Sequence, residues 1–326
     1  MKALVCSEFG PPSGLSVVEQ PTPEPGPEEV RIKVLAAGLN FPDLLLIMGQ
    51  YQVKPPLPFI PGLEAAGVVD AVGAAVQGWQ VGDRVMTTVM AGAFAEYLVV
   101  PARALAPTPE KLDDAEAAAF LVTYSTAYHA LHHHGQIKEN DLVLVLGAAG
   151  GVGSAAIELA RAAGAQVIAA ASSGDKLVFA ESLGAAELIN YASANLKEEV
   201  KTVTAGQGAD IVFDPVGGDL AQQAMRSLAW HGRYLVIGFA SGDIPAFPAN
   251  LALLKEAAIV GVWWGTWASR DPAGQARNLK ALGALVESGA IRPRVADRFP
   301  LEEYEAAFAC LSGRSVKGKV VFELGG

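Results

Sequence analysis

Six short apolar runs recur between residues 141 and 263, and they restrict the possible folds more than any other feature of this sequence. Stretches with a helical spacing of apolar residues separate the runs, so strands and helices follow one another in turn. Near-continuous apolar runs are typical of strands buried on both faces, as in a parallel sheet covered by helices. The pattern therefore predicts an α/β fold with a doubly wound parallel sheet of six strands, at residues 142–146, 166–170, 187–190, 211–214, 233–237 and 258–262.

The flanking regions have a different pattern. Residues 1–120 contain short strand-like runs interrupted by Gly and Pro, which is typical of a compact and mostly antiparallel β domain. After residue 270 the pattern predicts a helix, a strand, an amphipathic helix and a final strand at 319–324. We expect this tail to complete the first domain. Residues 1–122 and 264–326 then form a β-rich domain, and residues 123–263 form the parallel-sheet domain.

Composition excludes several classes of function. The 326 residues are 51% hydrophobic, yet the longest uncharged stretch carries four histidines and no signal peptide precedes it, so we expect a cytoplasmic protein without a membrane partner. The net charge of −10 argues against a nucleic-acid partner, because the phosphate backbone repels an acidic chain. Two cysteines, Cys6 and Cys310, are too few for a disulfide framework or a four-cysteine zinc site.

The first apolar run leads into a turn rich in glycine. From Ala148 onward the sequence matches the frame A-x-G-x-x-G, in which small residues let the backbone approach a pyrophosphate at a helix N-terminus. Its position after a strand and before a helix supports a dinucleotide site rather than a tight turn packed for its own sake. The expected cofactor-binding residues here are Ala149, Gly150, Gly151, Val152 and Gly153.

The end of the second run indicates which dinucleotide binds. NAD-binding domains usually place an acidic residue there to hold the ribose 2′-hydroxyl, but this run ends in alanines followed by Ser172 and Ser173. These hydroxyls and Lys176 suit a 2′-phosphate, so we predict NADPH. We interpret Asp175 as an N-terminal charge on the next helix. The alternative for Lys176 is a solvated lysine in the first turn of that helix.

Several motifs together resemble one family. Asn140, Asp141 and Leu142, with the glycine turn and Arg161, are similar to the quinone oxidoreductase (zeta-crystallin-like) branch of the medium-chain dehydrogenases/reductases. Segment 38–43, followed by 49–51, resembles the substrate segment of that family. Segments resembling its GroES-like domain occur at 61–67, 82–85, 94–97 and 318–321. The resemblance covers essentially the whole chain, although Glu158 stands where the family usually has Gln, and Leu45 where some bacterial members have Tyr.

The resemblance implies a GroES-like catalytic domain, built from both chain ends, and a Rossmann dinucleotide-binding domain. It also implies a homodimer that pairs the last Rossmann strand edge to edge, near Val260 to Trp264. Three of the five tryptophans, Trp263, Trp264 and Trp267, follow this strand, and large aromatics at a sheet edge suit an interface. The alternative for each is ordinary packing.

Zinc-dependent relatives hold a catalytic metal with a Cys and a Gly-His-Glu motif. Here Asn40 occupies the Cys position and Leu63 the His position, so we predict no metal. Three consecutive histidines on a helix, His132 to His134, point in different directions and rarely converge on one ion. We interpret them as a helix C-terminus, where partly charged histidines suit the helix dipole.

Two residues are candidates for catalysis. We expect Asn40 to donate its amide N–H to an oxygen of the substrate or of the nicotinamide ribose, the alternative being a turn-capping Asn. Tyr51 is a candidate stacking wall or proton donor, the alternative being a packed loop aromatic. Asp43 and Glu64 are more consistent with ordering loops than with catalysis.

The remaining candidates bind the cofactor. By resemblance, Thr126 meets the nicotinamide side and Tyr191 flanks the adenosine phosphate. Gly238 and Phe239 follow the fifth strand, where ligands bind in such folds. Helix capping is the alternative for Thr126, and a plain turn is the alternative for Gly238 and Phe239. Near the C-terminus, Lys317 and Arg314 are candidates for the 2′-phosphate, or else belong to a solvated basic loop.

These features predict an enzyme that transfers hydride from NADPH to a quinone without zinc. Without a metal to deprotonate an alcohol, reduction of an electron-poor acceptor is the favoured direction. An enone or enoyl reductase, which saturates a C=C bond conjugated to a carbonyl, shares every motif and stays open as an alternative. A non-catalytic, NADPH-binding structural protein is the alternative from another class.

Overall fold

The computed structural model describes residues 1–313 and 315–325. The chain divides into two compact units. Unit 1 contains residues 1–122 and 293–326, and unit 2 contains residues 123–292. Of the helices in the described part of the chain, none combines the length and the apolar character that a bilayer crossing requires.

Unit 2 contains the parallel sheet that the sequence predicts. In its described residues six strands pair in the order β10-β9-β8-β11-β12-β13, and every pair is parallel. The first two strands after β8 in the chain therefore lie to one side of β8 and the last three to the other. The strands are β8 (Leu142–Leu146), β9 (Gln166–Ala171), β10 (Glu187–Asn190), β11 (Ala209–Asp214), β12 (Leu228–Val236) and β13 (Ala258–Gly261).

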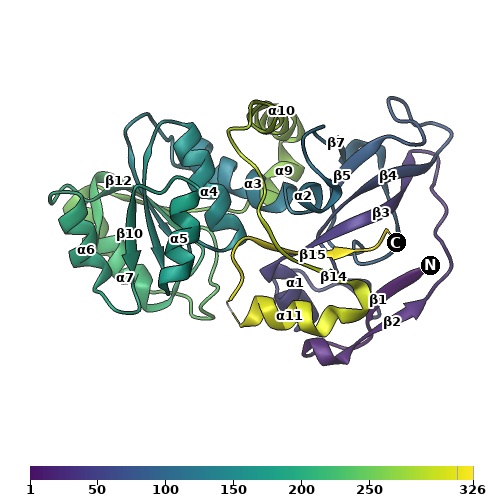
Figure 1. The fold of residues 1–326 in the computed structure, drawn as a ribbon, viewed down its shortest axis with the longest axis horizontal. Coiled ribbons are helices and arrows are strands. Elements are labelled where there is room, and N and C mark those ends of the chain that lie inside the picture. The colour runs from purple at the N-terminus through teal and green to yellow at the C-terminus, as the bar shows by residue number, and fades with distance from the viewer. Residues whose placement is uncertain (314, 326) are drawn as a thin grey trace. The chain divides into compact units, whose positions relative to one another are not determined.

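Helices cover both faces of this sheet (Figure 1). One face packs against α6, α7 and α8 through Leu144, Ile168 and other buried apolar side chains. The helices α4 and α5 lie on the opposite side in Figure 1. The bounds are α3 (Leu121–Tyr128), α4 (Gly151–Ala162), α5 (Gly174–Ser182), α6 (Leu196–Val203), α7 (Gly218–Arg226), α8 (Ala249–Lys255), α9 (Trp264–Arg270) and α10 (Pro272–Ser288), with a π-helical turn, η3, at His129–His134.

Residues 264–292 belong to unit 2, whereas the sequence analysis assigned them to the first domain. The reason is side-chain packing within unit 2. The Trp267 ring stacks on His129 at 4.2 Å between ring centroids, and Asn278 Oδ1 lies 3.1 Å from His133 Nε2. The Arg292 amide donates to Glu158 Oε2 at 3.0 Å. The tail therefore returns to unit 1 only from residue 293 onward.

Unit 1 is built mainly from antiparallel strands, as expected. Its described residues form a seven-stranded sheet in the order β14-β15-β3-β4-β5-β7, with β6 also paired to β3, and a separate antiparallel pair β1-β2. Among the described strand pairs of unit 1, only β14-β15 is parallel. The strands are β1 (Lys2–Cys6), β2 (Leu15–Glu19), β3 (Glu29–Leu39), β4 (Glu64–Val72), β5 (Arg84–Thr88), β6 (Tyr97–Pro101), β7 (Leu105–Pro107), β14 (Val295–Pro300) and β15 (Lys319–Glu323). The helices are α1 (Phe41–Ile47), α2 (Asp114–Ala118) and α11 (Tyr304–Ser312), with 3-10 turns at Pro12–Gly14, Ala102–Ala104 and Leu301–Glu303.

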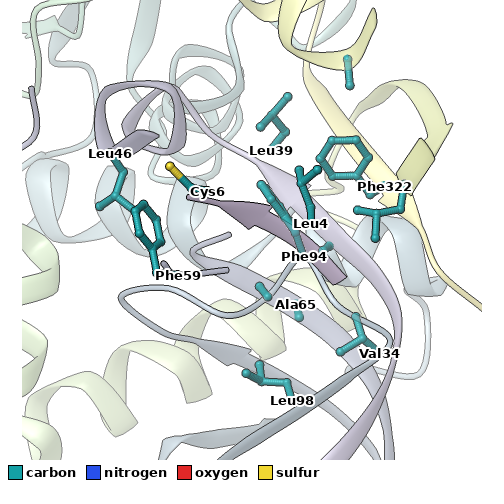
Figure 2. Close-up of a cluster of buried hydrophobic side chains, with 14 of the residues drawn as sticks. Leu4, Cys6, Val34, Leu39, Leu46, Phe59, Ala65, Phe94, Leu98 and Phe322 are labelled. Atoms are coloured by element: carbon teal, nitrogen blue, oxygen red, sulfur yellow. The ribbon is translucent and has the colours of Figure 1, made fainter. Parts of the chain in front are cut away.

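The C-terminal strand β15 completes unit 1 by pairing with β3, so the expected return of the tail is confirmed. It also contributes to the hydrophobic core. Phe322 packs edge-on against Phe94, with ring centroids 4.8 Å apart (Figure 2). The same cluster contains Leu4 and Leu39, both almost fully buried. Residues from both ends of the chain therefore share one core.

One close backbone approach determines how α4 leaves β8. A Cβ at position 153 would lie 2.3 Å from the Gly147 carbonyl oxygen, a distance that real Cβ contacts do not reach. Gly147 itself has φ +57°, in the left-handed region that favours glycine. The turn therefore requires glycine at both positions, for different reasons.

Replacing Gly153 by Ala should lower the free energy of unfolding by about 1–3 kcal/mol, because the new methyl group meets backbone that cannot move freely. Urea unfolding followed by circular dichroism measures the change. Gly174→Ala is the matched control: it begins α5, and a Cβ added there would meet no atom within 4 Å. We expect this control to be neutral or slightly stabilising. Equal effects of the two changes would contradict the packing argument.

Candidate functional site

The glycine turn lies at the carboxyl end of β8, which is buried on both faces. Gly150 is the N-cap of α4, and no side chain in the described part of the chain caps this helix. The N–H groups of its first turn are therefore available to an anion, and the helix dipole favours negative charge there. The expected residues Ala149 to Gly153 form this turn together.

The end of β9 lies beside this turn. The Ala148 amide donates to the Ala170 carbonyl oxygen at 3.2 Å, which joins the turn to β9. Lys176 Nζ donates to Ser172 Oγ at 3.0 Å, and the Ser173 hydroxyl donates to the Asp175 carboxylate. Asp175 lies in the first turn of α5, so its interpretation as an N-terminal helix charge is confirmed.

Other expected cofactor residues follow neighbouring strands at the same edge. The Tyr191 amide, just after β10, donates to the Ala171 carbonyl oxygen at 3.1 Å. Gly238 and Phe239 follow β12, and the Gly238 amide donates to the Asp214 carbonyl oxygen at 3.3 Å. Because parallel strands end at one edge, the fold gathers these segments there.

The last three expected cofactor residues do not directly follow a strand of the parallel sheet. Thr126 lies in α3 of unit 2. Lys317 precedes β15 in unit 1. Arg314 lies outside the described residues.

A loop that the sequence analysis did not single out also belongs to this edge. It connects β11 to α7, and Asp214 organises it by accepting the Val216 amide at 2.7 Å and the Gly217 amide at 2.9 Å. The other Asp214 oxygen accepts the Tyr234 hydroxyl. A Cβ at Gly147 would lie 3.0 Å from Val216, so the loop lies against the glycine turn.

Burial raises the pKa of the Asp214 carboxyl, opposed by the Tyr234 hydrogen bond, and burial together with Asp214 raises the pKa of Tyr234. The sequence signal was an acidic residue at a strand end, followed by Pro215, Val216 and two glycines. Such a composition marks a turn, but only the sheet order places that turn beside the glycine turn at 147–153.

In unit 1, Asn40 is the N-cap of α1, and its side chain is 5% exposed. Its side-chain nitrogen, Nδ2, donates to the Gly38 carbonyl oxygen at 3.1 Å and to Glu64 Oε1 at 2.9 Å. Its Oδ1 accepts from Lys319 Nζ at 2.6 Å. Both amide hydrogens therefore have protein partners. This corrects the expectation that Asn40 donates to a substrate or ribose oxygen, because the side chain is held in a buried network.

The other three unit 1 residues also have structural partners. Asp43 Oδ2 accepts the backbone N–H of Asn40 at 2.8 Å, while Asp43 Oδ1 is buried without a hydrogen-bond partner among the described residues. Glu64 Oε2 accepts the Val122 amide at 2.9 Å. Tyr51 is half-buried and packs against the hydrophobic cluster of unit 1. Asp43 and Glu64 thus order backbone, as expected.

Four histidines lie in the π-helical turn that follows α3. Burial, then His134 and His133, lower the pKa of His129 to about 4. Burial, then His133, also lower the pKa of His132 and of His134. The three residues His132, His133 and His134 lie in the last turn of η3, so their interpretation as a helix C-terminus is confirmed. The lowered pKa values of His132 and His134 disfavour their charged forms, because both side chains are partly buried.

The buried Asp43 carboxyl predicts a pH effect on stability. Burial raises its pKa from 3.8 to about 7, so between those values the folded chain holds a proton that the unfolded chain has released. Stability then falls as pH rises through this window. Asp43→Asn keeps an acceptor for the Asn40 backbone N–H but cannot ionise. The free energy of unfolding of this variant, relative to that of the wild type, should therefore rise by roughly 3 kcal/mol from pH 5 to pH 8.

Unfolding free energies of the two proteins across this pH range measure the effect. Asp83→Asn is the matched control. Asp83 also accepts the backbone N–H of the residue three positions earlier, Gln80, at 2.9 Å, but it does so in an exposed loop. A pH-independent difference between Asp43→Asn and the wild type would contradict the prediction.

Comparisons with known proteins agree with this two-unit architecture. Residues 26–110 match the family model of the alcohol dehydrogenase GroES-like domain, and residues 151–280 match that of the zinc-binding dehydrogenases. The second description implies a metal in part of the family.

The residues at the corresponding position do not fit a zinc ion. Asn40 supplies no thiolate and Leu63 no imidazole, and the Lys319 ammonium already lies 2.6 Å from Asn40 Oδ1 and 2.8 Å from Glu64 Oε1. A metal ion there would face a buried positive charge. Within residues 1–313 and 315–325, no group of three or more His, Cys, Asp or Glu side chains is arranged to hold a metal.

Full-length relatives identify the family. A quinone oxidoreductase-like protein 2 homolog of Nematostella vectensis is 38% identical over 98% of this chain and 88% of its own length. The Escherichia coli quinone oxidoreductase, solved in complex with NADPH, is 29% identical with a TM-score of 0.91, covering 99% of this chain and 100% of that one. The CurK enoyl reductase structure is 28% identical with a TM-score of 0.89, covering 99% and 98%. The chain therefore belongs to the quinone oxidoreductase family of the medium-chain dehydrogenases/reductases.

Proposed function

We propose that this protein is an NADPH-dependent reductase of quinones that works without zinc. The observation that carries the choice of cofactor is the Lys176–Ser172 hydrogen bond at the end of β9, beside the glycine turn. An ammonium and hydroxyls suit a phosphate, whereas an NAD-type site places a carboxylate at the strand end. The NADPH complex of the Escherichia coli relative supports the same choice.

The residues of unit 2 fit this cofactor. The turn from Ala149 to Gly153 suits the pyrophosphate, because the N–H groups of Gly151, Val152 and Gly153 lie at an uncapped helix N-terminus and a side chain at 153 has no room. The Gly150 N–H instead donates to the Gly147 carbonyl oxygen at 2.9 Å and closes the turn. Ser172, Ser173 and Lys176 suit the 2′-phosphate, with Lys317 as a further candidate. Tyr191, Thr126, Gly238 and Phe239 complete the proposed set. NADPH, when bound, supplies a hydride.

The protein's own contribution is orientation and charge stabilisation. A quinone that accepts a hydride becomes an anion that one proton converts to the quinol, so the chain must hold the acceptor and allow protonation. We keep Tyr51 as the candidate stacking residue or proton donor. Asn40 enters the proposal as a residue that holds segment 38–43, because both its amide hydrogens are bound within unit 1. Two free thiols, Cys6 and Cys310, are compatible with the proposed cytoplasmic location.

An enone or enoyl reductase is the second candidate, and the similarity to the CurK enoyl reductase favours it. Both reactions begin with hydride transfer to an electron-poor carbon, so the same cofactor site serves either. The decision depends on the acceptor.

Initial rates of NADPH oxidation with 1,4-benzoquinone, 1,4-naphthoquinone, cyclohexenone and a 2-enal decide between the candidates. We expect turnover with quinones, a clear preference for NADPH over NADH, and no loss of activity after treatment with EDTA. Turnover of enones alone would establish the second candidate. Tight NADPH binding without turnover of any acceptor would point to a non-catalytic protein.

Lys176→Ala tests the cofactor assignment directly. Losing one charged contact to the 2′-phosphate should raise the KM for NADPH roughly ten- to a hundred-fold and leave the KM for NADH nearly unchanged. Lys197→Ala is the control, because Lys197 lies in α6 and pairs with Glu198 at the surface. Equal KM values for both cofactors in the wild type would refute the assignment.

We also propose a homodimer formed through the free edge of β13. In the described residues β13 pairs only with β12, and Ile259 and Trp263 are 41% and 55% exposed. Trp264 and Trp267, in contrast, have contacts inside unit 2. Trp264 is buried and donates to Gln275, and Trp267 stacks on His129. The interface hypothesis therefore rests on the strand edge and Trp263.

Ile259→Glu should convert the dimer to a monomer, because the edge-to-edge pairing would bring two carboxylates together across the symmetry axis. Sedimentation velocity measures the result. Val178→Glu, at a 64% exposed position in α5, should leave the dimer intact. A wild-type chain that sediments as a monomer at micromolar concentration would refute the dimer.

A further inference from the structure

Lys319 is a buried lysine whose ammonium has three acceptors. Its Nζ donates to the Leu39 carbonyl oxygen at 2.9 Å, to Asn40 Oδ1 at 2.6 Å and to Glu64 Oε1 at 2.8 Å. Its side chain is 6% exposed and that of Glu64 is 1% exposed. A lysine ammonium has three N–H groups, so all of them are used and none is left for a substrate. Lys319 is therefore not the proton donor of the reaction.

The three acceptors come from parts of unit 1 that are far from Lys319 in sequence. Leu39 ends β3, Asn40 caps α1 and Glu64 begins β4, while Lys319 begins β15. The ammonium thus joins the C-terminal strand to the N-terminus of α1. Backbone pairing alone brings Val320 opposite Leu39, but it does not orient the Asn40 side chain.

The Glu64 carboxylate beside this cation is closely packed. A Cβ at Gly38 would lie 2.3 Å from the Ala118 carbonyl oxygen and 2.7 Å from Glu64 Oε1. Asp43 is the other carboxyl near Lys319, and its Oδ2 accepts the backbone N–H of Asn40. Glu64 is therefore fixed from several sides, and its charge needs a cation in contact.

We propose that the Lys319 ammonium is the fixed cation of this buried network and that it acts as a positioning residue for the Asn40 segment. It neutralises the Glu64 carboxylate and holds the Asn40 side chain by its oxygen.

This inference rests on the proposed function, because the Asn40 segment matters for turnover only if the chain reduces an acceptor. Buried ion pairs contribute little net stability but are strongly destabilising when one partner is removed. Removing Lys319 alone therefore reports mainly the unpaired Glu64. Removing both charges separates stability from positioning.

The experiment compares Lys319→Met with the double variant Lys319→Met/Glu64→Gln. The single variant should lower Tm by roughly 5–15 °C, because it leaves a buried carboxylate unpaired. The double variant should recover most of this loss, since it also removes the Glu64 carboxylate that Lys319 pairs with. Its kcat for 1,4-benzoquinone should nevertheless stay at least about ten-fold below that of the wild type, because the Asn40 oxygen still lacks its charged donor.

Two further readouts make the result specific. The Kd for NADPH, for which the proposal relies mainly on residues of unit 2, should change by less than about three-fold in the double variant, so the defect appears in kcat. Hydrogen exchange of the peptide covering residues 38–47 should be faster than in the wild type even where Tm is restored. Lys2→Met is the matched control, because Lys2 forms an exposed pair with Glu302 at 2.6 Å in the same unit.

A double variant with restored Tm, wild-type kcat and wild-type exchange at 38–47 would overturn the positioning role and leave Lys319 a purely structural partner of Glu64. If the wild type reduces no acceptor, the proposed function fails. The exchange measurement then still decides whether Lys319 orders the Asn40 segment. If the single variant does not fold, the double variant carries the test alone.

Discussion

The two-sided burial of β8 is the constraint on which unit 2 depends. Val143, Leu144, Val145 and Leu146 have no exposed surface, so helices must cover both faces of the sheet at this strand. With β9 on one side and β11 on the other, successive crossovers diverge at the carboxyl ends of β8 and β11. A ligand site then forms where the two sets of connections separate.

The close approach of α4 to β8 follows from the same constraint. Gly153 lets the helix start against the Gly147 carbonyl, and the loop that Asp214 orders lies against the other side of the turn. The open helix N-terminus at the turn is therefore a consequence of packing: small residues bring the helix start to the strand end, and no side chain among the described residues caps it.

Unit 1 solves a different problem, which is how to keep charges inside an apolar core. Phe94 and Phe322 form part of that core, while Lys319, Glu64 and Asn40 form a buried polar network. Such a network is tolerable because each charged group has several partners. It also gives the C-terminal strand a second role: β15 completes the sheet and supplies the cation that holds the N-terminus of α1.

The sequence predicted the parts of this protein that depend on local pattern. The alternation of strands and helices, the glycine turn, and Asp175 in the first turn of α5 all follow from residue type and spacing, which act over a few residues. The boundary of unit 2 did not follow, because residues 264–292 are held by the contacts of Trp267 and Asn278 with distant histidines.

By itself, the sequence determined the fold class, the position of the glycine turn and the presence of Asn40 and Leu63 where zinc-dependent relatives have Cys and His. Tertiary structure alone decided what Asn40 does and where the loop after Asp214 lies. It also decided that His129 is buried with a lowered pKa. The physical reason is that hydrogen-bond partners and desolvation come from residues far apart in the chain. Lys319 and Asn40 are separated by 279 positions, and only the folded sheet brings the ammonium to the amide oxygen.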